Sequence, residues 1–168
     1  MEKNHEKEFL EFYNQHADGI FRFCFFRVYN RELAKDLVQE TFLKTWEYIS
    51  RGNDVKSIKS LAYKIALNLI IDRTRKEKPT SSLEEMSNWG IDLKDQRELS
   101  KKIETKIEVE KILKAIKKID PIYQEVITMR FLNELSPKEI SLLLGESENV
   151  ISVRINRGKK LLRNLIKI

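Results

Sequence analysis

Cysteine, histidine and long apolar runs are all scarce in this sequence. Its 168 residues include one cysteine and two histidines, so an internal disulfide framework is excluded and no metal-binding spacing is present. No segment reaches the roughly 18 apolar residues that a membrane-spanning helix needs. Residues 1–8 are charged rather than apolar, unlike a secretory signal. We therefore expect a cytoplasmic protein with no metal and no cofactor.

Residues that break helices are also few. The chain has five glycines and three prolines, whereas leucine, isoleucine, lysine and glutamate are abundant. This composition predicts an all-α protein with one ordinary domain or two small ones. The sequence has no glycine loop that could cradle a phosphate and no evident pair of catalytic acid and base, so we expect a protein that is not an enzyme.

Apolar residues recur at helical spacing through the first part of the chain. The expected elements are two helices within residues 5–28 with a break near residues 17–19, a helix capped by Asn30 that ends near Ser50, a turn closed by Gly52, and a helix over residues 56–76. The residues expected on the buried face of this last helix are Ile58, Leu61, Ile65 and Leu69, together with Ala62 and Ala66. Tyr63 and Asn68 are polar or stacking groups interleaved with the basic residues of this helix.

Composition changes between residues 79 and 99. This stretch has five acidic and two basic residues, a proline, a glycine and no sustained helical period. Such a composition is typical of a solvated tether. The expected organisation is an N-terminal helical domain at residues 5–78, an acidic, flexible linker at 79–100 and a C-terminal helical domain at 101–168.

The C-terminal part carries a series of helix signals. Asp120, followed by a proline, predicts a helix start, and Ser136 with Glu139 predicts a capping box before a short helix. Gly145 permits the left-handed backbone of a turn, and Ser147 can cap a longer last helix. A short helix, a tight turn and a longer helix in this order are typical of a helix-turn-helix.

The last helix is expected to present a basic face. The positions that face the core by helical spacing are Ile151, Ile155, Gly158 and Leu162. The side chains that then project outward include Ser152, Val153, Arg154, Asn156, Arg157 and Lys160. From residue 149 onward the chain has six basic residues and no acidic one, an excess equal to the +6 charge of the whole chain. Basic residues that hold phosphates beside polar residues that read base edges predict DNA binding. A solvated amphipathic helix is the alternative.

Two further surfaces are less specific. Residues 51–78 have eight basic and three acidic side chains, and basic residues with an interleaved aromatic suit an unstacked nucleic-acid strand. Asp36, Gln39 and Glu40 share one face of the preceding helix. Taken alone, both surfaces are more typical of ordinary solvated helix faces.

Three segments together resemble one protein family. Residues 34–46 resemble the polymerase-binding helix of extracytoplasmic-function (ECF) sigma factors of the sigma-70 family. Residues 63–68, followed by Asp72 and Arg75, resemble their segment that engages the −10 promoter element. The segments that resemble the −35 domain are residues 123–126, 129–131, 135–140, 144–145 and 153–155. The resemblance implies two helical domains that direct promoter-specific transcription initiation.

The resemblance also implies a role for each surface. Asp36, Gln39 and Glu40 would contact the clamp coiled coil of the polymerase β′ subunit. The residues implied to hold the −10 element, including one flipped non-template base, are Asn53, Ser57, Lys64, Asn68 and Arg75. Those implied to meet the −35 element are Ser152, Val153, Arg154, Asn156, Arg157 and Lys160. Further implied partners are the β flap of core polymerase, promoter DNA and an anti-sigma factor.

The linker and two unusual residues add detail to this expectation. The linker would thread toward the polymerase active site, where the charges of Glu84, Glu85 and Asp92 suit a basic channel built for RNA. Leu61 stands where the family usually has a tryptophan. Gly158 replaces a common alanine, at a cost of about 1 kcal/mol in helix propensity.

Two other functions stay open on the residues alone. A stand-alone helix-turn-helix transcription regulator would bind a palindromic operator as a dimer, but it leaves the pattern of residues 36–46 unexplained. An adaptor or enzyme that binds RNA would use the basic helices, although no catalytic pair supports the enzyme.

Overall fold

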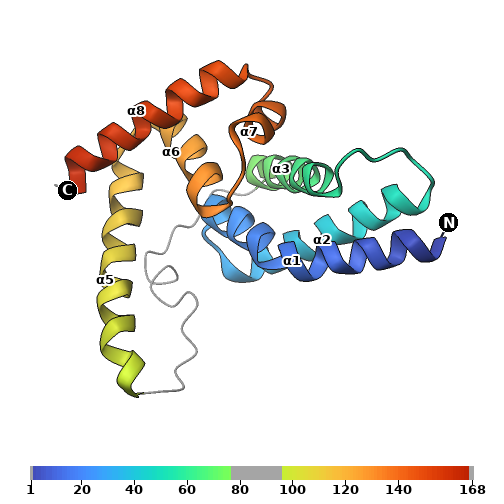
Figure 1. Ribbon diagram of the computed structural model, residues 1–168, viewed down its shortest axis with the longest axis horizontal. Helices are drawn as coiled ribbons and strands as arrows, with labels where there is room; N and C mark the ends of the chain where they lie inside the picture. The colour runs from blue at the N-terminus through green and yellow to red at the C-terminus, as the bar shows by residue number, and fades with distance from the viewer. Residues whose placement is uncertain (1, 77–95, 167–168) are drawn as a thin grey trace.

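Every regular element of the computed structural model is helical in the ranges that the structure describes, residues 2–76 and 96–166 (Figure 1). The elements are α1 (Glu2–Val28), α2 (Arg31–Ser50), α3 (Ile58–Lys76), α5 (Gln96–Lys118), α6 (Pro121–Ile127), the π-helix η1 (Thr128–Leu132), α7 (Pro137–Leu144) and α8 (Glu148–Ile166). The prediction of an all-α protein is confirmed. Within these ranges, none of the helices combines the length and the apolar character of a membrane span.

Helices α1, α2 and α3 pack together as a first unit. Each contributes completely buried side chains to the centre of the unit, among them Ile20, Leu37 and Ala66. The side-chain oxygen of Asn30 caps α2, because it accepts a hydrogen bond from the Leu33 N–H at 3.0 Å. This cap confirms the predicted start of the helix.

The predicted break near residues 17–19 is wrong, because α1 runs through it without interruption. Gly19 serves packing instead. A Cβ atom at this position would lie 3.0 Å from the hydroxyl of Tyr63 in α3, so the missing side chain lets α1 and α3 approach each other. A glycine that permits close packing and a glycine that ends a helix look alike in a single sequence.

The buried face of α3 differs from the predicted one. Ala62 and Ala66 are buried, as predicted, but the other buried residues are Tyr63, Leu67 and Ile70, whereas Ile58, Leu61, Ile65 and Leu69 are partly exposed. Tyr63 is 1% exposed, its ring meets the Phe23 ring edge-on at 5.1 Å between centroids, and burial raises the pKa of its hydroxyl to about 12. Tyr63 is therefore not available as the stacking group that the sequence suggests. Helix α3 packs against α1 and α2 and also against α7. More of its circumference is therefore buried than in a helix that packs on one side only.

Helices α5 to α8 with η1 form a second unit, and the predicted caps are present in it. Asp120 caps α6, and Ser136 and Glu139 form the reciprocal capping box of α7. Gly145 is left-handed at φ 67°, and the hydroxyl of Ser147 accepts a hydrogen bond from the first turn of α8 at 3.2 Å. These contacts confirm the helix-turn-helix elements that the sequence predicts.

The glycine at position 158 is explained by a close contact between two helices. A Cβ atom on Gly158 would lie 2.7 Å from the side chain of Ile127, at the end of α6. The loss of helix propensity relative to alanine is therefore offset by closer packing of α8 on α6.

Helix α5 begins at Gln96 rather than near residue 100, within the stretch predicted as linker. The other predicted linker residues, 79–95 with Glu84, Glu85 and Asp92, lie outside the residues that the structure describes.

Candidate nucleic-acid interface

The helix-turn-helix consists of α7, a turn at residues 145–147 and α8. The Ser141 hydroxyl donates a hydrogen bond to the Glu146 carbonyl at 2.6 Å and so fixes the turn to α7. Ile151, Ile155 and Gly158 are buried, as predicted, and Leu162 is partly buried. The opposite face of α8 lies at the surface of the molecule (Figure 1).

All six side chains predicted to meet the −35 element reach this surface of α8. Those that are exposed are Val153, Asn156, Arg157 and Lys160, and those that are partly buried are Ser152 and Arg154. The Arg154 guanidinium lies 3.0 Å from the carboxylate of Glu146 in the turn. This ion pair sets the direction of the Arg154 side chain, which sequence spacing does not reveal.

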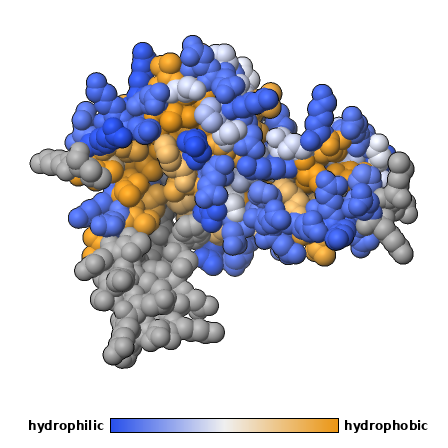
Figure 2. Space-filling model, viewed as in Figure 1, coloured by the Kyte–Doolittle hydropathy of each residue, from blue (hydrophilic) through white to orange (hydrophobic). Residues whose placement is uncertain are grey.

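A cavity of about 710 Å³ lies in the first unit, between the start of α1, the end of α2 and the loop before α3. Its apolar wall includes Trp46, Ile49 and Val55. Figure 2 shows hydrophobic side chains gathered among polar ones at this end of the molecule, beside the N-terminus.

Hydrogen-bond acceptors lie beside this apolar wall. The Asn53 Nδ2 atom donates one of its two hydrogens to the Tyr48 carbonyl at 2.8 Å, and its Oδ1 atom can accept a hydrogen bond from a ligand. Asp54 contributes a carboxylate, and Glu6 and Glu8 of α1 contribute two more. The cavity therefore favours a ligand that donates hydrogen bonds and disfavours anions such as phosphate.

The structure distributes the predicted −10 residues over two places. Asn53 lines the cavity, and Ser57 starts α3 nearby, where its hydroxyl accepts a hydrogen bond from the Ser60 N–H at 3.2 Å. The other three, which are exposed and share one face of α3, are Lys64, Asn68 and Arg75.

The contribution of α1 to the cavity is absent from the sequence prediction. His5, Glu6 and Glu8 line the cavity together with Trp46 of α2. The Trp46 ring lies 5.1 Å from the ring of Phe9, which attaches the first turns of α1 to the end of α2. Phe9 and Trp46 indicate in the sequence that α1 and α2 could pack together. They do not indicate that His5, Glu6 and Glu8 line a cavity.

The predicted polymerase-binding residues form one surface on α2. Asp36 and Gln39 are exposed, and Glu40 is partly buried beside them. The Glu40 carboxylate lies 3.8 Å from the Lys44 ammonium and 3.8 Å from the guanidinium of Arg73 in α3. Glu40 therefore connects this surface to the helix that carries three of the predicted −10 residues.

Two family models match the chain, one in each unit. The model of Sigma-70 region 2 matches residues 12–80, and that of Sigma-70, region 4 matches residues 109–162. The ECF RNA polymerase sigma factor SigW of Bacillus subtilis (strain 168) is 28% identical over 179 residues, 99% of this chain and 93% of that protein. The RNA polymerase sigma factor SigV of the same organism is 30% identical over 148 residues, 88% of this chain and 84% of that protein. The chain belongs to the ECF group of the sigma-70 family of RNA polymerase sigma factors.

Two solved structures share the fold. The sigma factor RpoE, solved in complex with the anti-sigma factor NepR from Bartonella quintana, has a TM-score of 0.69 at 18% identity, over 96% of this chain and 98% of that one. CnrH, solved with the cytosolic domain of CnrY, has a TM-score of 0.68 at 18% identity, over 96% of this chain and 89% of that one.

Membership in the sigma factor family assigns the surfaces to two regions. The α2 surface and α3 lie in region 2, and the helix-turn-helix lies in region 4. The family consists of transcription initiation factors rather than enzymes. A stand-alone helix-turn-helix regulator is not favoured, because the region 2 match includes the residues 36–46 that this alternative leaves unexplained.

Proposed function

We propose that this sigma factor recruits core RNA polymerase through α2 and places it on promoters through two separate DNA contacts. The observation that carries the proposal is the pair of nucleic-acid surfaces, one in each matched region. Region 4 presents the outward face of α8, and region 2 presents the cavity beside the exposed face of α3. Because the two contacts belong to one chain, the first raises the effective concentration of the second and so increases the overall affinity. The link between them also selects promoters in which the two elements have one particular separation.

At the −35 element, α8 enters the major groove, which is wide enough for a helix. Val153, Asn156 and Arg157 face the bases, and Ser152 and Lys160 face the strands beside them. The pair with Glu146 presents Arg154 to DNA from a fixed direction. Because the turn holds this side chain in place, little rotamer freedom is lost on binding.

At the −10 element, one non-template base leaves the stack and enters the cavity. Its extrusion costs a few kcal/mol, which contact with Trp46 and its apolar neighbours offsets. Asn53 Oδ1 and Asp54 accept hydrogen bonds, so the cavity favours a base that carries an amino group, such as adenine or cytosine, over thymine, whose single ring N–H lies between two carbonyl oxygens. The strand beside the extruded base runs along the face of α3 formed by Lys64, Asn68 and Arg75, and Ser57 fixes the start of that helix.

Region 2 and region 4 each make a contact with polymerase. Asp36, Gln39 and Glu40 bind the clamp coiled coil of β′, and region 4 binds the β flap. The domains extend over residues 5–78 and 101–168, and the linker at 79–100 carries Glu84, Glu85 and Asp92 toward the active site. Neutralising these three acids is expected to change abortive synthesis.

The proposed setting follows from the partners. Polymerase and chromosome share the cytoplasm of a bacterium, so the protein acts there, and it binds and captures strands without catalysing a reaction. RpoE was solved with the anti-sigma factor NepR, and CnrH was solved with the cytosolic domain of CnrY. We extend this to an anti-sigma factor that holds the present chain.

Run-off transcription with purified core polymerase tests the proposal. The protein should support initiation on a subset of genomic promoter fragments. The double variant Asp36→Ala/Gln39→Ala should weaken core binding about tenfold or more, because both side chains are exposed at the proposed contact. Ser50→Ala, an exposed change at the far end of the same helix, is the control. Absence of core binding together with absence of initiation on every fragment would contradict the proposal.

A further inference from the structure

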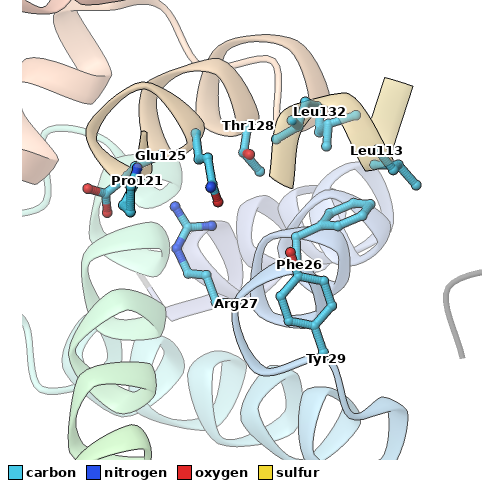
Figure 3. A pocket seen from close by; sticks show the side chains of 10 residues that line it. Phe26, Arg27, Tyr29, Leu113, Pro121, Glu125, Thr128 and Leu132 are labelled. Atoms are coloured by element: carbon cyan, nitrogen blue, oxygen red, sulfur yellow. The ribbon is translucent and has the colours of Figure 1, made fainter. Parts of the chain in front are cut away.

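A small open cavity lies where the end of α1 meets α5 and α6 (Figure 3). Its volume is about 150 Å³, and an apolar cavity of similar size in another protein holds a benzene molecule. None of the residues that line it belongs to the proposed contacts with DNA or with the polymerase clamp. The proposed function therefore does not account for this cavity.

One side of the cavity is apolar. The residues that supply this wall are Phe26 of α1, Leu113 and Ile116 of α5, and Leu132 at the end of η1. Tyr29 also lines the cavity, from the turn after α1, with a left-handed backbone at φ 49°. This conformation is unusual for a bulky side chain and persists only where the surroundings hold it. Such a wall favours a ligand with a compact apolar or aromatic body.

The connection between α5 and α6 holds the cavity in shape. The Gln124 Nε2 atom of α6 donates to the Ile119 carbonyl at 2.7 Å and to the Lys117 carbonyl at 3.3 Å, where α5 ends. Leu113 and Ile116 of the apolar wall belong to a buried hydrophobic cluster. Because these groups are already in place, little conformational freedom is lost when a ligand binds.

Arg27 brings a positive charge to the cavity. Figure 3 shows its side chain extending from the end of α1 toward α6. The guanidinium lies over the Phe23 ring, 3.7 Å from the ring centroid, so the ring covers one of its faces. Its Nη1 atom donates to the Phe23 carbonyl at 3.0 Å, which is its one hydrogen bond to the residues that the structure describes. Since a guanidinium has five N–H groups, its edge can still donate to a ligand.

The charge of Arg27 is only partly compensated. Burial lowers the pKa of Arg27 to about 10, so the side chain is still charged at neutral pH. Glu125 of α6 raises this pKa, but the two side chains form no ion pair within the part of the chain that the structure describes. The Lys117 ammonium, 4.3 Å from the centroid of the Tyr29 ring, adds a second positive charge nearby. Because an opposite charge stabilises a desolvated one, the cavity favours an anion.

The donors around the cavity fit a carboxylate. The edge of a guanidinium presents parallel N–H groups that match the two oxygens of a planar carboxylate. The Thr128 hydroxyl, which also lines the cavity, can donate a further hydrogen bond. An inorganic anion would use these donors but would leave the apolar wall without a partner.

We propose that this cavity binds a small organic acid in which a carboxylate is attached to an apolar body of about the size of a benzene ring. The carboxylate meets the edge of Arg27 and the hydroxyl of Thr128. The apolar body lies against Leu113, Ile116 and Leu132. The site is separate from the proposed contacts with DNA and polymerase, so its occupancy does not depend on them.

Binding of benzoate to the full chain tests the proposal. The expected dissociation constant is about 1 mM, a reasonable value for so small a ligand. Benzamide has the same shape without the charge, and acetate has the charge without the apolar body, so each should bind about tenfold more weakly. NMR spectra of isotope-labelled protein should show benzoate-induced shifts at the Arg27 Nε–H group and at the backbone amides of Leu113 and Thr128.

Substitutions at the polar end of the cavity should change the affinity in opposite directions. Arg27→Gln removes the positive charge and should weaken benzoate binding about tenfold or more, whereas Arg27→Lys keeps the charge without the planar fork and should recover part of the loss. Glu125→Gln removes the negative charge beside the cavity and should strengthen binding about threefold. This variant tests the proposal even if the Arg27 variants fold poorly.

Lys114→Gln is the matched control, because it removes one positive charge from an exposed position on α5 outside the cavity lining. It should leave the benzoate affinity within about twofold of the wild type, since solvent screens an exposed charge.

The proposal is overturned if the benzoate-induced shifts appear on the basic face of α8 rather than around the cavity, because the acid then binds to surface charge alone. It is also overturned if benzamide or acetate binds as tightly as benzoate, or if Arg27→Gln and Lys114→Gln have equal effects. Absence of benzoate-induced shifts at about 10 mM ligand would contradict it as well.

Discussion

Gly158 illustrates how much of this protein is decided by single residues. Replacing it with alanine gains about 1 kcal/mol of helix propensity but places a Cβ atom 2.7 Å from Ile127. Overpacking of this kind costs about 1–3 kcal/mol. We expect Gly158→Ala to destabilise the protein by about 1 kcal/mol net in urea unfolding. If the variant were more stable than the wild type, α6 and α8 could move apart enough to accept the Cβ atom without a loss of free energy of unfolding.

Asp54 is expected to select the extruded base. The wild-type holoenzyme should prefer adenine or cytosine to thymine about tenfold at one −10 position, since a correct base contact contributes about 1–3 kcal/mol. Asp54→Asn adds a donor to the cavity and should reduce this preference to about threefold or less. Run-off rates on templates with each base at each position provide the measurement. Glu47→Gln, exposed on α2 away from the cavity lining, should keep the wild-type preference.

His16 should make stability depend on pH. Burial lowers its pKa, the Lys59 charge lowers it further, and Glu139 raises it less. The unfolded chain therefore takes up the proton first as the pH falls. Its contribution to the free energy of unfolding is complete above about pH 6.5 and is lost as the pH falls through the lowered value. Denaturation at pH 7.5 and 5.5 should show a smaller change for His16→Gln, and an equal change would contradict the assignment.

At the scale of elements, helix ends were predictable and helix faces were less so. Caps depend on residues within one turn, so Asn30, Ser136 and Gly145 are found at the predicted ends. The buried face of α3 and the continuity of α1 depend on contacts between Tyr63 and Gly19, which are distant in sequence. The candidate site shows the same difference. The exposed positions on α8 can be predicted from the helical period of that one segment. The cavity cannot, because its lining comes from α1, α2 and the loop before α3 together.

The capping box should contribute measurably to the helix-turn-helix. Ser136→Ala removes the hydroxyl that accepts the Glu139 N–H at 3.2 Å. The expected loss is about 1 kcal/mol in the free energy of unfolding, measured by urea titration. Ser50→Ala, which removes an exposed hydroxyl at the end of α2, should change stability by less than about 0.5 kcal/mol. Equal effects of the two variants would contradict the role of the cap.

At the scale of the whole molecule, the two regions have two relations to each other. In the free protein they share a core, and on a promoter they must lie far apart.

The central claim is that one small chain reads two DNA elements at a fixed separation. Its most direct test is transcription by the wild-type holoenzyme from a template library that is randomised upstream of a fixed start, followed by sequencing of the templates that give transcripts. The account predicts two unlike sequence blocks whose centres are about 25 base pairs apart, roughly 85 Å along the duplex. Enrichment of one palindromic block, or of blocks without a preferred separation, would contradict it.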